Sequence, residues 1–226
     1  MCVRYGLNQR DLRQWTETIV KRKGERAVRI REDLPDDAEA FPGDAGTIAL
    51  LRDDALTLEP ATWGLMPAWA KPPEYKPDFG RKNAYNARAE TVFEKPSFRA
   101  AAKYRRCLVP MTRFYERTHG RWLRMKFHEA GAFAAPGLFA DPEPGVSDTT
   151  TYTVVTTEAN ETIAEVHDRM PVILDPRDYD AWLDPEAKRE DLRKLLIPCP
   201  PEWFTIEDAG PIGRAKKAEA TLFEPV

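Results

Sequence analysis

Short runs of β-branched and aromatic residues, separated by turn-forming residues, constrain the fold of this chain more than any other feature. The runs cover residues 47–53, 56–67, 106–117, 121–130, 132–140 and 151–159. Turn-forming residues lie between them, as at His119-Gly120 and at the Pro- and Gly-rich stretch 141–145. Strands therefore dominate the middle of the chain. We expect an α+β fold with a mostly antiparallel, barrel-like β core and peripheral helices.

Helix signals surround these runs. Residues 8–20 predict an amphipathic helix, with Asn8 as N-cap and with Leu12, Trp15 and Ile19 on one face. The remaining helix candidates cover residues 91–103, 160–166, 176–183 and 185–196.

The length of 226 residues and the 42% hydrophobic content fit a single compact domain over residues 1–226. Residues 32–46 are acidic and rich in Pro and Gly, so we expect a surface loop there. Residues 210–226 are expected to form a partly ordered tail.

Charge and cysteine content exclude several classes of protein. A formal net charge of -3 gives no overall attraction to nucleic acid, so any polyanion site must arise from local clusters of Arg and Lys. The sequence contains no run of about 18 apolar residues, so it predicts no membrane-spanning helix. The 3 cysteines favour a reducing compartment. The sequence contains no CxxC or HxxxH spacing that would predict a metal site. We expect a cytoplasmic monomer without cofactor or metal.

Cys2 directly follows the initiator methionine, which is normally removed when the second residue is small. Removal would place an α-amine and a thiol, with pKa values of about 8 and about 8.5, on one residue. Such an aminothiol condenses with an aldehyde to an imine and then closes to a five-membered thiazolidine. Cys2 could instead be a buried structural residue, or the nucleophile of an amide hydrolase whose base is its own amine.

Two segments supply candidate binding residues. Trp69 follows a strand candidate and could stack on an exposed base. Asn86 and Arg88 alternate with small alanines, so an extended chain would direct both towards one face, where an amide and a guanidinium suit a phosphate or a sugar. A capping and turn segment is the alternative.

Residues 99–126 contain nine basic residues and Glu116 as the single acid. A lone carboxylate among cations, with Arg113 and Arg117 beside it, is expected to stay ionised and to act as a base or to orient an amine. An ordinary salt bridge is the alternative. His167, flanked by Asp168 and Arg169, could donate and accept protons near neutral pH, although a structural histidine is the more common case.

Together these segments resemble the SOS-response-associated peptidase (SRAP) family of abasic-site processing proteins. The matching landmarks are Cys2 with Arg4 and the segments 63–67, 86–91, 106–110, 114–116 and 167–171. They run in the family's order and span about three quarters of the chain. The ordered set, more than any one motif, carries the resemblance.

The resemblance implies a β-rich domain with a positively charged cleft for single-stranded DNA. It implies a lyase-like imine stage and a thiazolidine crosslink between processed Cys2 and an abasic site, in the response to DNA damage. Glu116, His167 and Asn86 match the catalytic glutamate, the catalytic histidine and the asparagine that holds the sugar and the N-terminus. The phosphate contacts match Arg4, Arg88 and Arg169, to which the basic run adds Arg113.

Three positions depart from the family pattern. Val3 replaces a usual Gly, and Arg113 and Arg117 replace a frequent Gly and Trp around Phe-Tyr-Glu. Two other functions stay open. One is an N-terminal-nucleophile hydrolase or self-processing peptidase, which would use the same Cys2, Glu116 and His167. The other is a DNA-binding module without catalysis. When bound to DNA, the protein would associate with the nucleoid.

Overall fold

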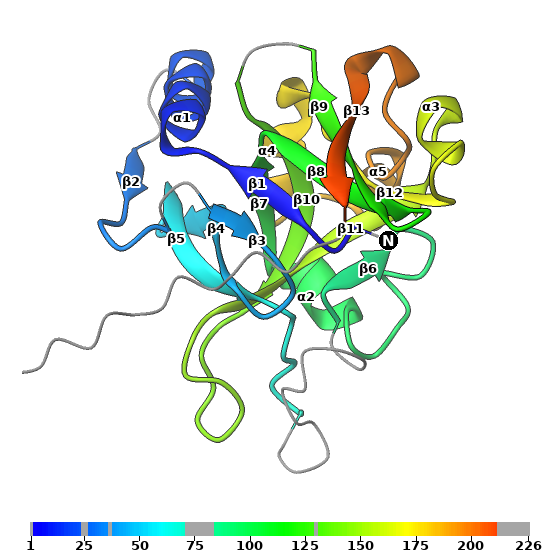
Figure 1. Cartoon of the computed structure of the whole chain (residues 1–226). Helices are drawn as coiled ribbons and strands as arrows, with labels where there is room; N and C mark the ends of the chain where they lie inside the picture. The colour runs from blue at the N-terminus through cyan, green and yellow to red at the C-terminus, as the bar shows by residue number, and fades with distance from the viewer. Residues whose placement is uncertain (1, 24–26, 36–37, 71–83, 129–130, 212–226) are drawn as a thin grey trace, which may run out of the picture.

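The computed structural model describes residues 2–23, 27–35, 38–70, 84–128 and 131–211 (Figure 1). Its strands are short and follow one another closely along the chain. In chain order they are β1 (Tyr5–Leu7), β2 (Val28–Ile30), β3 (Ala38–Ala40), β4 (Ala45–Arg52), β5 (Ala55–Trp63), β6 (Asn86–Arg88), β7 (Arg106–Met111), β8 (Arg113–Thr118), β9 (Arg121–Phe127), β10 (Phe133–Ala140), β11 (Thr151–Glu158), β12 (Arg169–Pro171) and β13 (Phe204–Pro211).

The helices lie around the sheets (Figure 1). They are α1 (Gln9–Lys23), α2 (Arg99–Tyr104), α3 (Glu161–Ala164), α4 (Tyr179–Leu183) and α5 (Arg189–Lys194), with 3₁₀ turns η1 (Pro176–Asp178) and η2 (Pro201–Trp203). None of the helices in the described part of the chain combines the length and apolarity needed to cross a membrane.

Two sheets form the body of the molecule. The first has the order β13-β9-β8-β1-β3, and all its pairings are antiparallel. The second has the order β12-β11-β10-β7-β4-β5-β2, with β6 added beside β11. A parallel pairing of β11 with β5, through Thr151↔Thr62 and Tyr152↔Trp63, joins strands within this second sheet into a closed ring. The predicted α+β fold with a barrel-like core is confirmed.

The run at residues 106–117 is two strands in different sheets. β7 pairs with β10 and β4 in the second sheet, whereas β8 pairs with β9 and β1 in the first. The change occurs at Thr112, whose backbone N–H and hydroxyl both donate to the carbonyl of Gly6, at 2.7 and 3.0 Å. This crossing lets one segment carry residues to both sheets.

The core has two parts because both faces of the second sheet are covered. One part lies between the sheets and includes Tyr5, Phe114 and Met125. The other lies under the helices, where Leu12, Trp15 and Ile19 of α1 are buried. Burial on both faces explains why β7 and β10 are buried at every position.

The sequence correctly predicts α1, including its cap, because the Oδ1 atom of Asn8 accepts a hydrogen bond from the Asp11 N–H at 2.7 Å. The helix expected over residues 91–103 is wrong for its first half. Turns occupy that half and α2 begins only at Arg99. Pro96 provides the reason, since it lacks a backbone N–H and clashes with the preceding turn of a helix.

Part of the range 32–46, where a surface loop is expected, forms a strand. Residues 38–40 form β3, which pairs with β1 through Tyr5↔Ala40 and Leu7↔Ala38. The acidic composition indicates exposure, but the unpaired backbone groups at the edge of β1 favour a further strand. At the other end of the chain, β13 extends through Pro211, and the rest of the expected tail, residues 212–226, lies outside the described residues.

Candidate active site

Cys2 is fully buried in the core between the two sheets. Its carbonyl accepts a hydrogen bond from Nδ2 of Asn86 at 2.7 Å, and its thiol donates to the carbonyl of Arg4 at 3.7 Å. Burial, together with the negative charge of Glu116, raises the pKa of the thiol well above its usual range. Residue 2 is thus held in place with its sulfur as a neutral thiol.

Asn86 comes from β6, a short strand that runs parallel to β11 with Asn86 opposite Val154. Ala87 is buried while Asn86 is half-buried and Arg88 is exposed, the alternation expected of an extended chain. The Oδ1 atom of Asn86 is buried and has no hydrogen-bond partner among the described residues. The amide therefore anchors residue 2 through its nitrogen and keeps an acceptor available.

Glu116 lies in β8 and is only 2% exposed. Burial, with an added contribution from the negative charge of Asp168, raises its pKa to about 7. The neighbouring cations of the basic run do not face this carboxylate. Arg113 and Arg117 have the opposite parity in the strand, so their side chains lie on the other face of the sheet.

His167 precedes β12, and its backbone N–H donates to the carbonyl of Ile163 at 2.9 Å. The Arg169 N–H donates to Nδ1 of the ring at 2.9 Å, so in the neutral ring the proton resides on Nε2. The carboxylate of Asp168 also lies 2.9 Å from Nδ1, a contact that becomes an ion pair only in the doubly protonated ring. Burial lowers the pKa of His167, which favours the neutral form.

These groups form one site built from distant parts of the chain. Asn86 contacts Cys2 directly, and the electrostatic effects of Glu116 on Cys2 and of Asp168 on Glu116 place those residues near one another. The site offers a fixed residue 2, a carboxyl group that exchanges protons near neutral pH and a neutral imidazole. Among the described residues, no group of His, Cys, Asp or Glu is arranged to hold a metal ion.

Arg4 and Arg113 lie together on the outer face of the first sheet. Nε of Arg4 donates to Oε2 of Glu39 at 2.8 Å, and Nη2 of Arg113 lies 3.6 Å from Oε1 of the same carboxylate. The hydroxyl of Tyr115 also donates to Glu39. Sequence reasoning missed Glu39, because nothing in the local pattern distinguishes it from the other acids of residues 32–46.

Arg169 forms a bidentate salt bridge with Glu90, with nitrogen–oxygen distances of 2.5 and 3.0 Å. It also donates a hydrogen bond to the carbonyl of Thr156. Arg88 is exposed, and its positive charge contributes to lowering the pKa of Glu90, after the hydrogen bond from Arg169. Glu90 lies in the turn that follows β6 and forms the main contact of Arg169.

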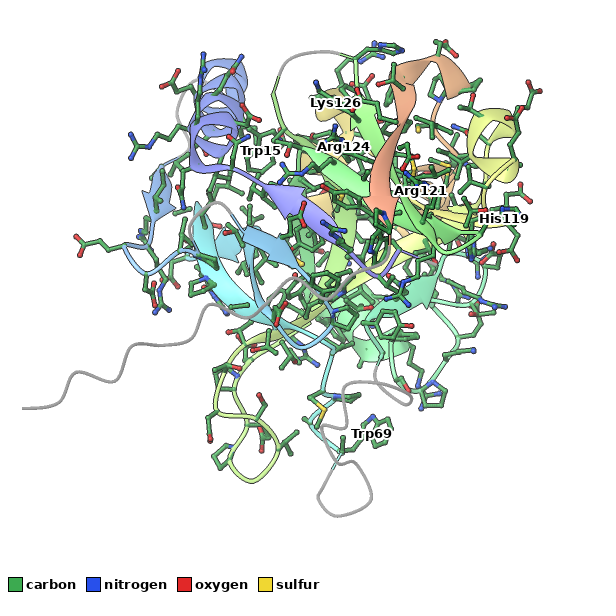
Figure 2. The ribbon with its side chains drawn as sticks, viewed as in Figure 1. Trp15, Trp69, His119, Arg121, Arg124 and Lys126 are labelled. Atoms are coloured by element: carbon green, nitrogen blue, oxygen red, sulfur yellow. The ribbon has the colours of Figure 1, made fainter. Side chains whose placement is uncertain are left out.

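Trp69 is 56% exposed. Figure 2 shows it at the opposite end of the view from Arg124 and Lys126 of β9. The nine basic residues of the 99–126 run do not form one patch. Arg106 is buried and binds backbone carbonyls, while the cations of β8 and β9 lie on the first sheet.

The sequence pattern of the SOS response associated peptidase (SRAP) family matches residues 1–209. The chain belongs to this family. Among SRAP relatives, the abasic site processing protein YoqW of Bacillus subtilis (strain 168) is 40% identical over 148 residues, which cover 60% of this chain and 62% of YoqW. The abasic site processing protein YedK of Escherichia coli (strain K12) is 25% identical over 213 residues, covering 87% of this chain and 90% of YedK.

The match to this SRAP chain spans only 61–63% of the length of the Bacillus subtilis relatives YoqW, YoaM and YobE. Solved structures agree on the fold. A protein from Bacteroides thetaiotaomicron superposes with a TM-score of 0.77 at 22% identity, covering 92% of this chain and 91% of that one. A protein from Bordetella bronchiseptica gives a TM-score of 0.74 at 22% identity, covering 92% and 99%.

Proposed function

We propose that this SRAP protein captures abasic sites in single-stranded DNA by forming a thiazolidine crosslink through Cys2, once the initiator methionine has been removed. The hydrogen bond from Asn86 to the carbonyl of Cys2 carries the proposal. It fixes the residue that would bear the free amine beside Glu116, whose pKa of about 7 suits proton transfer at neutral pH. The names of relatives such as YoqW and YedK support the same substrate.

The first step joins the amine of Cys2 to C1′ of the opened sugar. Glu116 accepts a proton from the ammonium, the nitrogen attacks the aldehyde, and loss of water gives an imine. His167, neutral and with its proton on Nε2, donates to the sugar ring oxygen and so favours the open aldehyde. Asn86 keeps the reacting residue in position.

The second step closes the ring. The sulfur of Cys2 bonds to the imine carbon and the thiol proton passes to the nitrogen, so that a cyclic secondary amine results. The high pKa of the thiol means that it reacts as a neutral group which loses its proton during closure. The adduct removes the aldehyde and prevents strand breakage by β-elimination.

Cations and one aromatic side chain would guide the DNA. Arg4, Arg88, Arg113 and Arg169 would contact phosphates, and Trp69 would stack on a base. The protein would then be found on DNA in the cell, consistent with a role in the damage response. Because the family description includes the word peptidase, a cysteine hydrolase or self-processing peptidase using Cys2 is the second candidate.

Intact mass spectrometry after incubation with single-stranded abasic DNA tests the proposal. We expect a mass gain of one oligonucleotide less one water, mapped to Cys2. Cys2→Ala should give only a transient imine, reducible by borohydride, and no durable adduct. A parallel peptide-hydrolysis assay distinguishes the peptidase. An unmodified protein, or an equally durable adduct with Cys2→Ala, would contradict the proposed chemistry.

A further inference from the structure

The outer face of the first sheet carries an arrangement that the proposed chemistry leaves unexplained. We infer that Arg4, Arg113 and Tyr115 form a phosphodiester-binding subsite, which the carboxylate of Glu39 occupies in the free protein and which a DNA strand enters by displacing it. This inference rests on the proposed function in taking DNA as the ligand. It adds that the Glu39 carboxylate competes with the DNA for the same donors.

Both oxygens of Glu39 are engaged by converging donors. Oε2 accepts from Arg4, and Oε1 accepts from the hydroxyl of Tyr115 and faces Nη2 of Arg113. Although burial opposes it, the hydrogen bonds from Tyr115 and Arg4 hold the pKa of Glu39 below its usual value. Two guanidinium groups therefore surround one ionised carboxylate, which leaves a local positive charge after pairing.

The donors are held by contacts that do not involve Glu39. The guanidinium of Arg4 lies 4.0 Å from the ring centre of Tyr115 and 5.0 Å from that of Trp122. Arg113 donates to the Tyr115 hydroxyl at 2.9 Å and to Oγ1 of Thr112 at 3.1 Å. The subsite would therefore keep its shape when the carboxylate leaves.

Gly6 makes room for Arg113. A Cβ atom at Gly6 would lie 2.5 Å from the guanidinium carbon of Arg113, so no larger residue fits there without moving that side chain. The cation that completes the subsite is thus accommodated by its neighbour in β1.

Glu39 is the member of the cluster that an incoming anion can most readily displace. It lies in β3, a strand of 3 residues at the edge of the sheet that pairs with β1. Its side chain is 28% exposed and that of Arg113 is 25% exposed, so an anion can approach from solvent.

A phosphodiester can take the place of the Glu39 carboxylate in the subsite. Its two unesterified oxygens can be shared by the two guanidinium groups, since Arg binds phosphate and carboxylate through paired contacts of the same kind. Arg4 follows Cys2 by two positions, a span of at most about 7 Å between Cα atoms. Because the Arg4 side chain lies on the outer face and Glu116 on the core face, a strand with its sugar at Cys2 would reach Arg4 by passing over the start of β1.

The test measures binding of an undamaged single-stranded oligonucleotide, by fluorescence anisotropy at several salt concentrations. Glu39→Gln keeps the size of the side chain and removes the competing charge. We expect affinity to rise about three- to fivefold at low salt, with a smaller gain at high salt where charges are screened.

Asp208→Asn is the matched control. Asp208 pairs with Arg121 on the same sheet, so its replacement removes the same charge without freeing Arg124, which contacts Tyr115. In an Arg113→Ala background, Glu39→Gln should no longer improve binding. Thermal unfolding of each variant establishes that it is folded.

Three results would overturn the inference. They are unchanged or weaker binding by Glu39→Gln, an equal gain from Asp208→Asn, and a gain that persists without Arg113. Because the oligonucleotide has no abasic site, binding is measured independently of Cys2. A protein that forms no crosslink but shows this pattern would disprove the proposed reaction and leave the subsite intact.

Discussion

At the scale of single residues, Glu116 and Arg113 illustrate how one strand serves two environments. They are three positions apart in β8, and the alternation of side chains sends Glu116 into the core and Arg113 to the outer face. Glu116 consequently has a pKa of about 7, whereas Glu39, which meets Arg113, has a lowered pKa. The environment of each carboxylate, more than its sequence neighbours, decides its charge.

Replacing Glu116 by Gln should change how stability depends on pH. The folded-state pKa of about 7 lies above the ordinary value of 4.5, so the folded protein binds the proton more tightly than the unfolded chain. The contribution of Glu116 is therefore fully present below about pH 4 and is lost as pH rises through about 7. Between pH 5 and pH 8, we expect the free energy of unfolding of Glu116→Gln to rise by about 1–3 kcal/mol relative to that of the parent.

Urea unfolding of both proteins at pH 5 and pH 8 measures this effect. Glu207→Gln provides a surface control, since Glu207 has a lowered pKa and should give no such gain over this range. Parallel pH curves for Glu116→Gln and the parent would show that Glu116 titrates normally.

At the scale of elements, α1 depends on its first turn. The side chain of Asn8 both accepts from the Asp11 N–H at 2.7 Å and donates to the Asp11 carboxylate at 2.6 Å. The helix in turn places Trp15 against Tyr179, with its indole N–H 3.3 Å from the hydroxyl. A cap at one end of α1 thus supports packing between α1 and α4.

Asn8→Ala should lower the free energy of unfolding by about 1 kcal/mol, because one N-terminal N–H loses its partner. Asn8→Ser retains an oxygen at the cap and should recover most of this loss. Chemical denaturation distinguishes the two variants. Equal stability of Asn8→Ala and the parent would mean that the cap contributes nothing.

At the scale of the whole molecule, Arg106 connects the sheet with two helices. Its guanidinium donates to the carbonyls of Ala102 and Lys103 at the end of α2 and to those of Trp182 and Asp184 at the end of α4. These carbonyls are at helix C-termini, where a cation is favourable. Burial lowers the pKa of Arg106, yet its hydrogen bonds hold it between the elements.

Arg106→Met should destabilise the protein by about 2–4 kcal/mol, because several buried carbonyls lose their donor. Arg105→Met is the matched control, since Nε of Arg105 has no partner among the described residues. It should cost less than about 1 kcal/mol. Similar thermal midpoints for the two variants would argue against a connecting role of Arg106.

The sequence predicts the strand-rich middle and the first helix well, because both follow from local chemistry. Alternating β-branched residues and turns such as His119-Gly120, where both residues have positive φ, predict the β8–β9 hairpin directly. The short strands β1, β2 and β3 escape prediction. Each has only 3 residues, and its existence depends on a partner strand remote in sequence.

The residue types available for chemistry can be read from the amino-acid order, namely an aminothiol precursor at Cys2 with Asn86, Glu116 and His167 downstream. The same order also determined an antiparallel β fold, since side-chain alternation and turn residues act over a few positions. Tertiary structure alone decided the charge of Glu116 and the pairing of Arg4 and Arg113 with Glu39. Burial and the convergence of side chains from separate strands are properties of the folded chain, and no local pattern contains them.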